Sequence, residues 1–365
     1  MKIAFITNHP APYRDDTLKC FNEYEDVKLA VLNVEPEPSN HKEWEFVGNS
    51  LNRYLTKPIN IPVLGAYNPG VLSMLKKYDL LIIGSYFPAT MLASLIYANI
   101  KKIPYIICSD AVKDGKKFIK LKKIFVSRFW KSAKAFWVPG KCSKDYFISK
   151  GVNENNIYLG YYTNDAKKMK LEIENTNDES LFKQYNIERS KYKFLFVGKL
   201  IHTRHIERLV KAVKLLEKQR DDFVCIVIGD GDDGKIINEY CQTGNHIVHI
   251  NRVAYNQLHS FYNIADAYIH PGEEPYSLAT VEGVIAGIPI IATKEVGAVH
   301  DYLEDGVNGY IFDGTSEMLA FNMNNLIDGK ISNKGITNMQ NYVVNDRGCE
   351  WAAKQLYAAA KKALK

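Results

Sequence analysis

Short apolar runs alternate with amphipathic segments along the whole chain. The runs are β-branched and apolar throughout, which is typical of parallel strands buried on both faces. In the first half they are KIAFIT (2–7), VKLAVLN (27–33), DLLIIG (79–84), PYIICS (104–109), KAFWVP (134–139) and NIYLG (156–160). In the second half they are KFLFVG (193–198), FVCIVIGDG (223–231), HIVHI (246–250), AYIHP (267–271), IPIIAT (288–293) and NGYIF (308–312). The pattern predicts an α/β protein with two doubly wound sheets.

The boundary between the two halves is predicted from a change in composition. Residues 166–192 are polar, charged and poor in strand formers, so we interpret them as a linker region. An N-terminal domain would then span 1–165 and a C-terminal domain 193–344. Residues 345–365 are rich in strong helix formers, which predicts a C-terminal helix.

Composition is that of a soluble globular chain, with 46% hydrophobic and 24% charged residues over 365 positions. No run approaches the roughly 20 apolar residues of a membrane span, and the apolar stretch at the start is too short for a signal peptide. We therefore expect a cytoplasmic protein.

The net charge of +6 is unevenly divided. Residues 1–165 hold 23 Lys and Arg against 15 Asp and Glu, whereas residues 166–365 hold 24 against 26. Nine of the cations, with one acid, fall between Lys113 and Lys134, among apolar residues that include Phe129 and Trp130. This segment is either a solvated helix face or an element that lies on an anionic membrane surface. It resembles no nucleic-acid-binding module, so no nucleic-acid partner is expected.

The loop after the first run argues against a dinucleotide cofactor. A nicotinamide or flavin site needs G-x-G-x-x-G there, and the chain has NHPAPYRDD instead; it has no P-loop motif either. Tyr13 and Arg14 in this loop are candidates for ligand binding at the carboxyl end of a parallel strand. The alternative is a proline-stiffened turn with solvated polar side chains.

The segment GKLIHTRH (198–205) follows the first run of the second half. It brings Gly198, Lys199 and Arg204 to the same kind of strand end, where two cations can neutralise a diphosphate. The alternative is a pair of ordinary surface cations.

A third candidate is HPGEEPYSLATVE (270–282), which has carboxylates at Glu274 and Glu282. The apolar pattern that follows predicts a helix beginning near Ser277, a suitable N-cap residue. The free N–H groups of a helix start favour a phosphate. A carboxylate on either side of a phosphate is suited to hydroxyl groups, such as those of a ribose and a second sugar.

EPYSLATVE resembles the E-P-F-G-L-x-x-x-E signature of glycosyltransferase family 4. Five further segments resemble family motifs in the same order: ITNHPAPYRDDTL, WVPGKCSKDYFISKGVNENNIYLGYYTND, FLFVGKLIHTRHIERLVKA, VIGDGDD and GAVHDYLEDGVNGYIF. The resemblance implies a GT-B fold, in which two Rossmann-like domains face each other across a cleft and the C-terminal helix returns to the N-terminal domain.

The resemblance also implies roles for individual residues. Glu274 would hold hydroxyls of the donor sugar, Glu282 the ribose, and Lys199 and Arg204 the diphosphate. Backbone N–H groups of Ser277 and Leu278 would meet the distal phosphate, with Pro275, Tyr276 and Gly198 beside it, and the main chain of Arg252 and Val253 would meet the base. Tyr13, Arg14 and Asp110 are acceptor-side candidates.

The chain departs from the family at several of these positions. Ser277, His205 and Ala298 replace glycines that the family usually has. Asp110 lies in a stretch, Cys108 to Asp110, where many members have a functional histidine.

The implied activity is retaining transfer of a hexosyl group from a nucleotide diphosphate sugar, with UDP-sugars favoured over GDP-sugars. The acceptor would be a saccharide, typically lipid-linked, in the synthesis of a bacterial surface glycan such as O-antigen, capsule or exopolysaccharide. No metal or other cofactor is expected, and the protein would associate peripherally with the inner face of the cell membrane. Alternatives are a nucleotide-sugar 2-epimerase of the same fold, a sugar phosphorylase, and a catalytically silent protein that binds the membrane surface.

Overall fold

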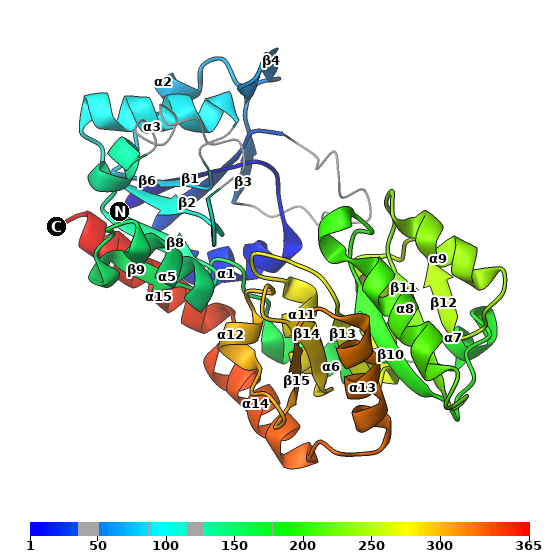
Figure 1. Cartoon of the computed structure of the whole chain (residues 1–365). Helices are drawn as coiled ribbons and strands as arrows, with labels where there is room; N and C mark the ends of the chain where they lie inside the picture. Colours follow the sequence, from blue (N-terminus) through cyan, green and yellow to red (C-terminus); the bar gives the residue numbers. More distant parts are fainter. Residues whose placement is uncertain (36–50, 86–87, 115–126, 177) are drawn as a thin grey trace. The chain divides into compact units, whose positions relative to one another are not determined.

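The computed structural model describes residues 1–35, 51–85, 88–114, 127–176 and 178–365. The chain divides into two compact units (Figure 1). Unit 1 consists of Met1–Asp165 and Cys349–Lys365, and unit 2 of Ala166–Gly348. Each unit is built around its own parallel sheet, which confirms the predicted α/β fold with two Rossmann-like domains.

Unit 1 contains a seven-stranded sheet in the order β3-β2-β1-β6-β7-β8-β9. Its strands are β1 (Lys2–Thr7), β2 (Lys28–Asn33), β3 (Asn52–Tyr54), β6 (Leu80–Ile83), β7 (Tyr105–Cys108), β8 (Ala135–Val138) and β9 (Ile157–Leu159). All are paired in parallel, and β1 lies between β2 and β6, with Phe5 opposite Val31 and Ile82. The six runs predicted as strands in the first half are therefore all present. The short strands β3, β4 (Ile59–Ile61) and β5 (Gly65–Tyr67) were not predicted, because three residues carry too little pattern.

Helices cover both faces of this sheet. One face packs on α1 (Pro12–Asn22) and on the C-terminal helix α15 (Cys349–Ala363), which contribute Leu18, Phe21 and Leu356 to one core. The other face packs on α2 (Val71–Leu75), α3 (Ala89–Lys101) and α5 (Lys141–Ser149). The C-terminal helix thus belongs to unit 1, as the resemblance implied, and it begins at Cys349.

Unit 2 contains a six-stranded sheet in the order β12-β11-β10-β13-β14-β15. Its strands are β10 (Tyr192–Val197), β11 (Phe223–Ile228), β12 (Ile247–Ile250), β13 (Ala267–His270), β14 (Ile290–Thr293) and β15 (Gly309–Phe312). They match the six runs predicted in the second half. All pairs are parallel, so every strand presents its carboxyl end at the same edge of the sheet.

The helices of unit 2 bury apolar faces against this sheet and against one another. One layer is formed by α8 (Ile206–Leu216), α9 (Gly234–Cys241) and α13 (Ser316–Ile327), which share a core with the strands. The remaining helices are α6 (Ala166–Glu174), α7 (Glu179–Gln184), α10 (Leu258–Ile264), α11 (Leu278–Ala286), α12 (Val299–Tyr302) and α14 (Asn333–Asp346). Of these, α6 packs on α10, α11 and α14.

The structure differs from the prediction at residues 166–192. This stretch was expected to be a linker, but it carries α6 and α7 and is part of unit 2. The reason is that α6 buries Ala166, Met169 and Ile173 along one side of an otherwise charged helix. The high proportion of polar residues concealed this narrow apolar stripe.

The basic segment between Lys113 and Lys134 is only partly described, since residues 115–126 lie outside the described residues. Residues 127–132 are helical. Phe129 is buried in the core of unit 1, and Trp130 packs edge-on against Phe147. These two aromatic side chains therefore stabilise the unit. The membrane interpretation had predicted that they would face lipid. Within the described part of the chain, no helix has the length and apolar character needed to cross a membrane.

Candidate functional site

The candidate site of unit 2 lies where the strand order of its sheet changes direction. β10 is paired with β11 on one side and with β13 on the other, so the connections leaving β10 and β13 run to opposite sides. In open α/β sheets such a switch point leaves a crevice at the carboxyl ends of the strands. The segments 198–205 and 271–277 leave β10 and β13 at this point, and they carry most of the residues predicted from the sequence.

The loop after β10 is fixed by the glycine turn after β11. Gly198 donates its N–H to Ile228 O at 3.0 Å, and Leu200 donates to Asp230 O at 3.0 Å. A Cβ at Gly229 would lie 1.8 Å from Gly198 O, and one at Gly231 would lie 2.3 Å from Leu200 O, so both glycines are required by close backbone approach. Leu200 is fully buried, while the neighbouring Lys199 is exposed. The loop thus holds Lys199 at the strand end with its ammonium group accessible.

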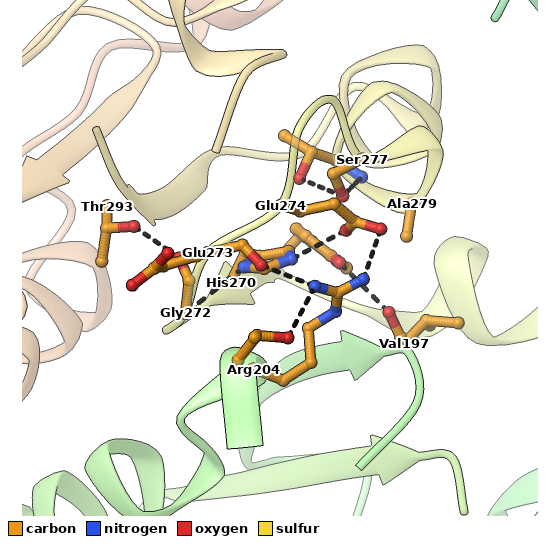
Figure 2. A network of polar contacts seen from close by, with 12 residues as sticks. Val197, Arg204, His270, Gly272, Glu273, Glu274, Ser277, Ala279 and Thr293 are labelled. Atoms are coloured by element: carbon orange, nitrogen blue, oxygen red, sulfur yellow. Dashed lines mark hydrogen bonds and ion pairs between the residues drawn. The ribbon is translucent and has the colours of Figure 1, made fainter. Parts of the chain in front are cut away.

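Arg204 joins the two loops across the switch point (Figure 2). Its Nη2 donates to Glu274 Oε1 at 2.6 Å, and its Nη1 donates to the carbonyl oxygen of Glu273 at 2.5 Å. The backbones are joined as well, because Glu273 N–H donates to Thr203 O at 2.7 Å. Gly272 permits this approach, since a Cβ there would lie 2.4 Å from Thr203 O. Arg204 and Glu274, which the sequence analysis identified separately, are therefore brought into direct contact.

Glu274 has a second partner that the sequence analysis missed. His270, at the end of β13, is 1% exposed, and its Nε2 lies 3.0 Å from Glu274 Oε2. Its Nδ1 accepts from Gly272 N–H at 3.4 Å, which leaves Nε2 as the protonated nitrogen that donates to the carboxylate. Burial alone would raise the pKa of Glu274, but the hydrogen bond from His270 and the charge of Arg204 hold that pKa below its ordinary value. The only sequence signal for His270 was its position at a strand end, as the first residue of HPGEE.

The backbone of the Glu274 loop is held by the segment after β14. Glu274 N–H donates to Glu295 O at 3.2 Å, Gly297 N–H donates to Glu274 O at 2.9 Å, and Ala298 N–H donates to Tyr276 O at 3.0 Å. A Cβ at Gly297 would lie 1.9 Å from Pro275 O, so glycine is required there. Ala298 is fully buried without disturbing this pairing, so alanine is accommodated at that position.

Ser277 begins α11, as predicted. Its Oγ accepts hydrogen bonds from Thr280 N–H at 3.3 Å and from Thr280 Oγ1 at 3.0 Å. Its backbone has φ 85° and ψ 94°, a conformation that glycine adopts more readily, which agrees with the glycine usual in the family. Pro275 is exposed, whereas Tyr276 is buried with its hydroxyl 3.3 Å from that of Tyr302. Tyr276 thus contributes packing, and only its main chain can serve a ligand.

Glu282 lies on α11 and is 5% exposed. Tyr262 donates to its Oε2 at 3.0 Å, and Tyr255 donates to its Oε1 at 3.4 Å. Burial, with the Glu282 charge beside it, raises the pKa of Tyr262 well above its ordinary value, so the phenol stays a donor. Nearby in sequence, Val253 is half-buried and Arg252 forms an exposed ion pair of 3.0 Å with Asp230 of the glycine turn. The structure thus fixes the Glu282 side chain firmly, whereas that of Arg252 is held only at the surface.

The acceptor-side candidates all lie in unit 1, at strand ends of its own sheet. Tyr13 and Arg14 follow β1, and Asp110 follows β7. The Tyr13 ring packs edge-on against Tyr162 with 5.5 Å between centroids, and Tyr162 donates to Asp110 Oδ2 at 3.3 Å. Among the described residues no group of three or more His, Cys, Asp and Glu side chains is arranged to hold a metal ion.

Comparison with protein families finds a match within unit 2. Residues 177–341 match the family described as Glycosyl transferases group 1. Lipopolysaccharide 1,2-N-acetylglucosaminetransferase of Salmonella typhimurium is 28% identical over 144 residues, which are 36% of this chain and 38% of that enzyme. The chain thus matches well under half of that relative's length. An uncharacterized glycosyltransferase of Methanocaldococcus jannaschii is 24% identical over 324 residues, covering 80% of this chain and 79% of the relative.

The whole fold also matches a solved structure. Anabaena HepE, in complex with UDP, superposes with a TM-score of 0.76 at 18% identity, covering 99% of this chain and 100% of that one. At this identity the match establishes the fold. The chain thus has the fold of the GT-B glycosyltransferases, and its residues 177–341 are similar to Glycosyl transferases group 1.

Proposed function

We propose that this chain, a GT-B protein whose residues 177–341 match Glycosyl transferases group 1, is a retaining hexosyltransferase of family 4 that uses a nucleotide diphosphate sugar. The observation that carries the proposal is the network of Arg204, Glu274 and His270 at the switch point of unit 2 (Figure 2). It holds an ionised carboxylate and a guanidinium beside the start of α11. These are the groups needed to bind neutral hydroxyls and an anionic diphosphate next to each other.

In this proposal each part of the donor meets a different group. Glu274 accepts hydrogen bonds from hydroxyls of the donor sugar. Lys199, Arg204 and the N–H groups of Ser277 and Leu278 neutralise the diphosphate without a metal ion. Glu282 binds the ribose, and the main chain of Arg252 and Val253 binds the base. A UDP-sugar is the favoured donor, because the Anabaena neighbour was solved with UDP and with UDP-glucose.

The reaction is a substitution at the anomeric carbon. The acceptor hydroxyl oxygen forms a bond to that carbon, the bond from the carbon to the diphosphate oxygen breaks, and the departing diphosphate takes the acceptor proton on the same face. The protein contributes positioning and stabilisation of negative charge on the leaving group. Lys199 and Arg204 act where that charge develops, while Glu274 orients the sugar.

The proposed acceptor is a saccharide, carried on a lipid, in the synthesis of a bacterial surface glycan. The named Salmonella relative acts on lipopolysaccharide, which supports this class of acceptor. In the proposal unit 1 receives the acceptor, and its excess of Lys and Arg directs it toward an anionic membrane surface. Flotation with vesicles containing anionic lipid tests this association; binding that is independent of salt would contradict it.

A panel of nucleotide sugars tests the proposed activity. We expect one UDP-, GDP- or ADP-hexose to raise the Tm of the protein and to release its nucleoside diphosphate slowly in water. If no member of the panel raises the Tm, the transferase proposal fails. Conversion of the bound sugar to its C2 epimer, seen by NMR, would identify an epimerase instead. Binding without turnover in the presence of bacterial glycolipid would identify a catalytically silent protein.

A further inference from the structure

Arg14 in α1 is a buried cation with few partners. It is 4% exposed, its Nη2 donates to the His9 carbonyl oxygen at 2.7 Å, and its guanidinium carbon lies 5.2 Å from the centroid of the Phe5 ring. The Nε atom is buried and has no acceptor among the described residues. Within the described part of the chain, no carboxylate comes within ion-pair distance of Arg14. Among the described residues, one hydrogen bond to the neutral carbonyl group of His9 is therefore the polar contact of this charge.

Arg14 lies where a ligand would bind in a sheet of this kind. The strand order of unit 1 changes direction between β1 and β6, and Arg14 belongs to the segment that leaves β1. Tyr161 follows β9 at the same edge of the sheet, and its hydroxyl would lie 3.4 Å from a Cβ at Gly84, the residue after β6. The nearby rings of Tyr13 and Tyr162 are only half-buried. Two of the tyrosines near Arg14 are thus partly exposed at the switch point.

The groups around Arg14 do not neutralise it. Burial raises the pKa of Tyr13, Tyr161 and Tyr162, so these phenols are uncharged at neutral pH. Burial would lower the pKa of Arg14, but negative charge nearby, which at neutral pH is that of the Asp15 carboxylate, keeps the pKa above its ordinary value, so the guanidinium stays charged. Removing a cation from water without an ion-pair partner is unfavourable. A bound anion would offset this cost.

We propose that Arg14 binds an oxyanion of the acceptor. The inference rests on the proposed function and specifies its acceptor: the substrate carries a phosphate or carboxylate group next to the saccharide that receives the hexose. The guanidinium fork is suited to two parallel hydrogen bonds with such a group. Asp110, held beside Tyr162, is an acceptor for a neutral hydroxyl of the same ligand. The oxyanion has two chemical sources, the diphosphate of a lipid carrier or the carboxylate of an acidic sugar.

NMR of the arginine side chains tests the proposal on the intact protein. The Nε–H signal of Arg14, assigned by its absence in Arg14→Lys, is followed in the presence of saturating UDP, which occupies the proposed donor site. The probes are inorganic pyrophosphate, glucuronate and glucose. We expect pyrophosphate or glucuronate to shift the signal in a saturable way and glucose to leave it unchanged. A shift with pyrophosphate alone identifies a diphosphate carrier, and one with glucuronate alone an acidic sugar; no shift with either anion overturns the proposal.

Two variants separate anion binding from a structural role. Arg14→Met removes the charge and keeps an unbranched side chain of similar length, and we expect it to weaken binding of the effective anion by about tenfold to a hundredfold. Lys101→Met, at an exposed lysine of α3 in the same unit, is the control and leaves the affinity at Arg14 unchanged. If Arg14→Met binds the anion as tightly as wild type, the proposal is wrong. If Arg14→Met does not fold, the titration of the wild-type Arg14 Nε–H signal with the two anions still decides whether Arg14 binds an oxyanion.

The outcomes for Arg14 and for the proposed activity are distinguishable. If the protein binds the anion at Arg14 but responds to no nucleotide sugar, the proposed anion site is supported and the proposed transferase function is wrong. If the protein turns over a nucleotide sugar but neither anion shifts the Arg14 signal, the proposed transferase function is supported and the proposed anion site is wrong.

Discussion

Arg204 Nη2 lies 2.6 Å from Glu274 Oε1, and this ion pair joins the loops that leave β10 and β13. The two side chains are 15% and 27% exposed, so the pair is shielded from water but reachable from one side. The sequence separates them by 70 positions. Their contact follows from the order of the strands, which makes β10 and β13 neighbours. The predictions below depend on this relationship and on the residues that support it.

The first prediction concerns pH. The folded pKa of Glu274 is depressed, so its contribution to stability is present above the unfolded value near 4.5 and is lost as the pH falls through the folded pKa. Activity that depends on ionised Glu274 should therefore persist below pH 4.5 on the acid side. Arg204→Met removes one cause of the depression, so we expect the acid limb of the profile of kcat against pH to move upward. An unmoved limb would show that Arg204 does not control the ionisation of Glu274.

The second prediction concerns His270 as a positioning residue. His270→Phe removes the donor to Glu274 Oε2, and we expect kcat to fall by about tenfold to a hundredfold, because a hydrogen bond to a charged group is lost. His270→Gln can still donate to the carboxylate and should recover part of this loss. Steady-state kinetics of the two variants, at equal Tm, is the measurement. Equal activity in both variants would mean that His270 contributes packing alone.

The third prediction concerns the conformation of Ser277. Its positive φ favours glycine, but its hydroxyl caps α11. Ser277→Gly removes the backbone strain together with the helix cap. The two effects on the free energy of unfolding have opposite signs, so we expect them nearly to cancel. Ser277→Ala keeps the strain and loses the cap, so we expect a loss of about 1 to 2 kcal/mol in the free energy of unfolding. Urea denaturation of both variants is the test; an alanine variant as stable as the glycine variant would contradict the assigned role of the cap.

The fourth prediction concerns Glu282. If Glu282 binds the ribose, Glu282→Gln should raise KM for the donor by about tenfold and change kcat little. Tyr262→Phe is a useful comparison, because it removes the donor to Glu282 Oε2 and leaves the carboxylate in place. We expect its effect on KM to be smaller. A fall in kcat with unchanged KM in Glu282→Gln would exclude ribose binding as its main role.

The sequence predicted the strands of both sheets because they are buried on both faces and read as continuous apolar runs. It predicted the start of α11 because Ser277 precedes an apolar helical pattern and provides a capping oxygen. The prediction of a linker at 166–192 was wrong. Three buried apolar side chains on α6 are enough to pack this helix into unit 2.

The candidate site was predictable in its residue types but incompletely in its contacts. Arg204 and Glu274 were each identified, yet nothing in the sequence specifies that they pair, because strand order is a tertiary property. His270 was missed because a single histidine at a strand end is more often a core residue than a partner of a functional group. Arg14 was named as a ligand-binding candidate, but its burial without a carboxylate partner is visible only in the fold.

The central claim is that Glu274 holds the donor sugar for transfer. The most direct measurement is the rate of nucleoside diphosphate release from the responsive nucleotide sugar by wild type, Glu274→Gln and Glu304→Gln, the last an exposed carboxylate of unit 2. We expect Glu274→Gln to keep the wild-type fold by circular dichroism and to lose at least about a hundredfold in rate, while Glu304→Gln retains the full rate. A Glu274→Gln protein that releases the nucleotide at the wild-type rate would contradict the account.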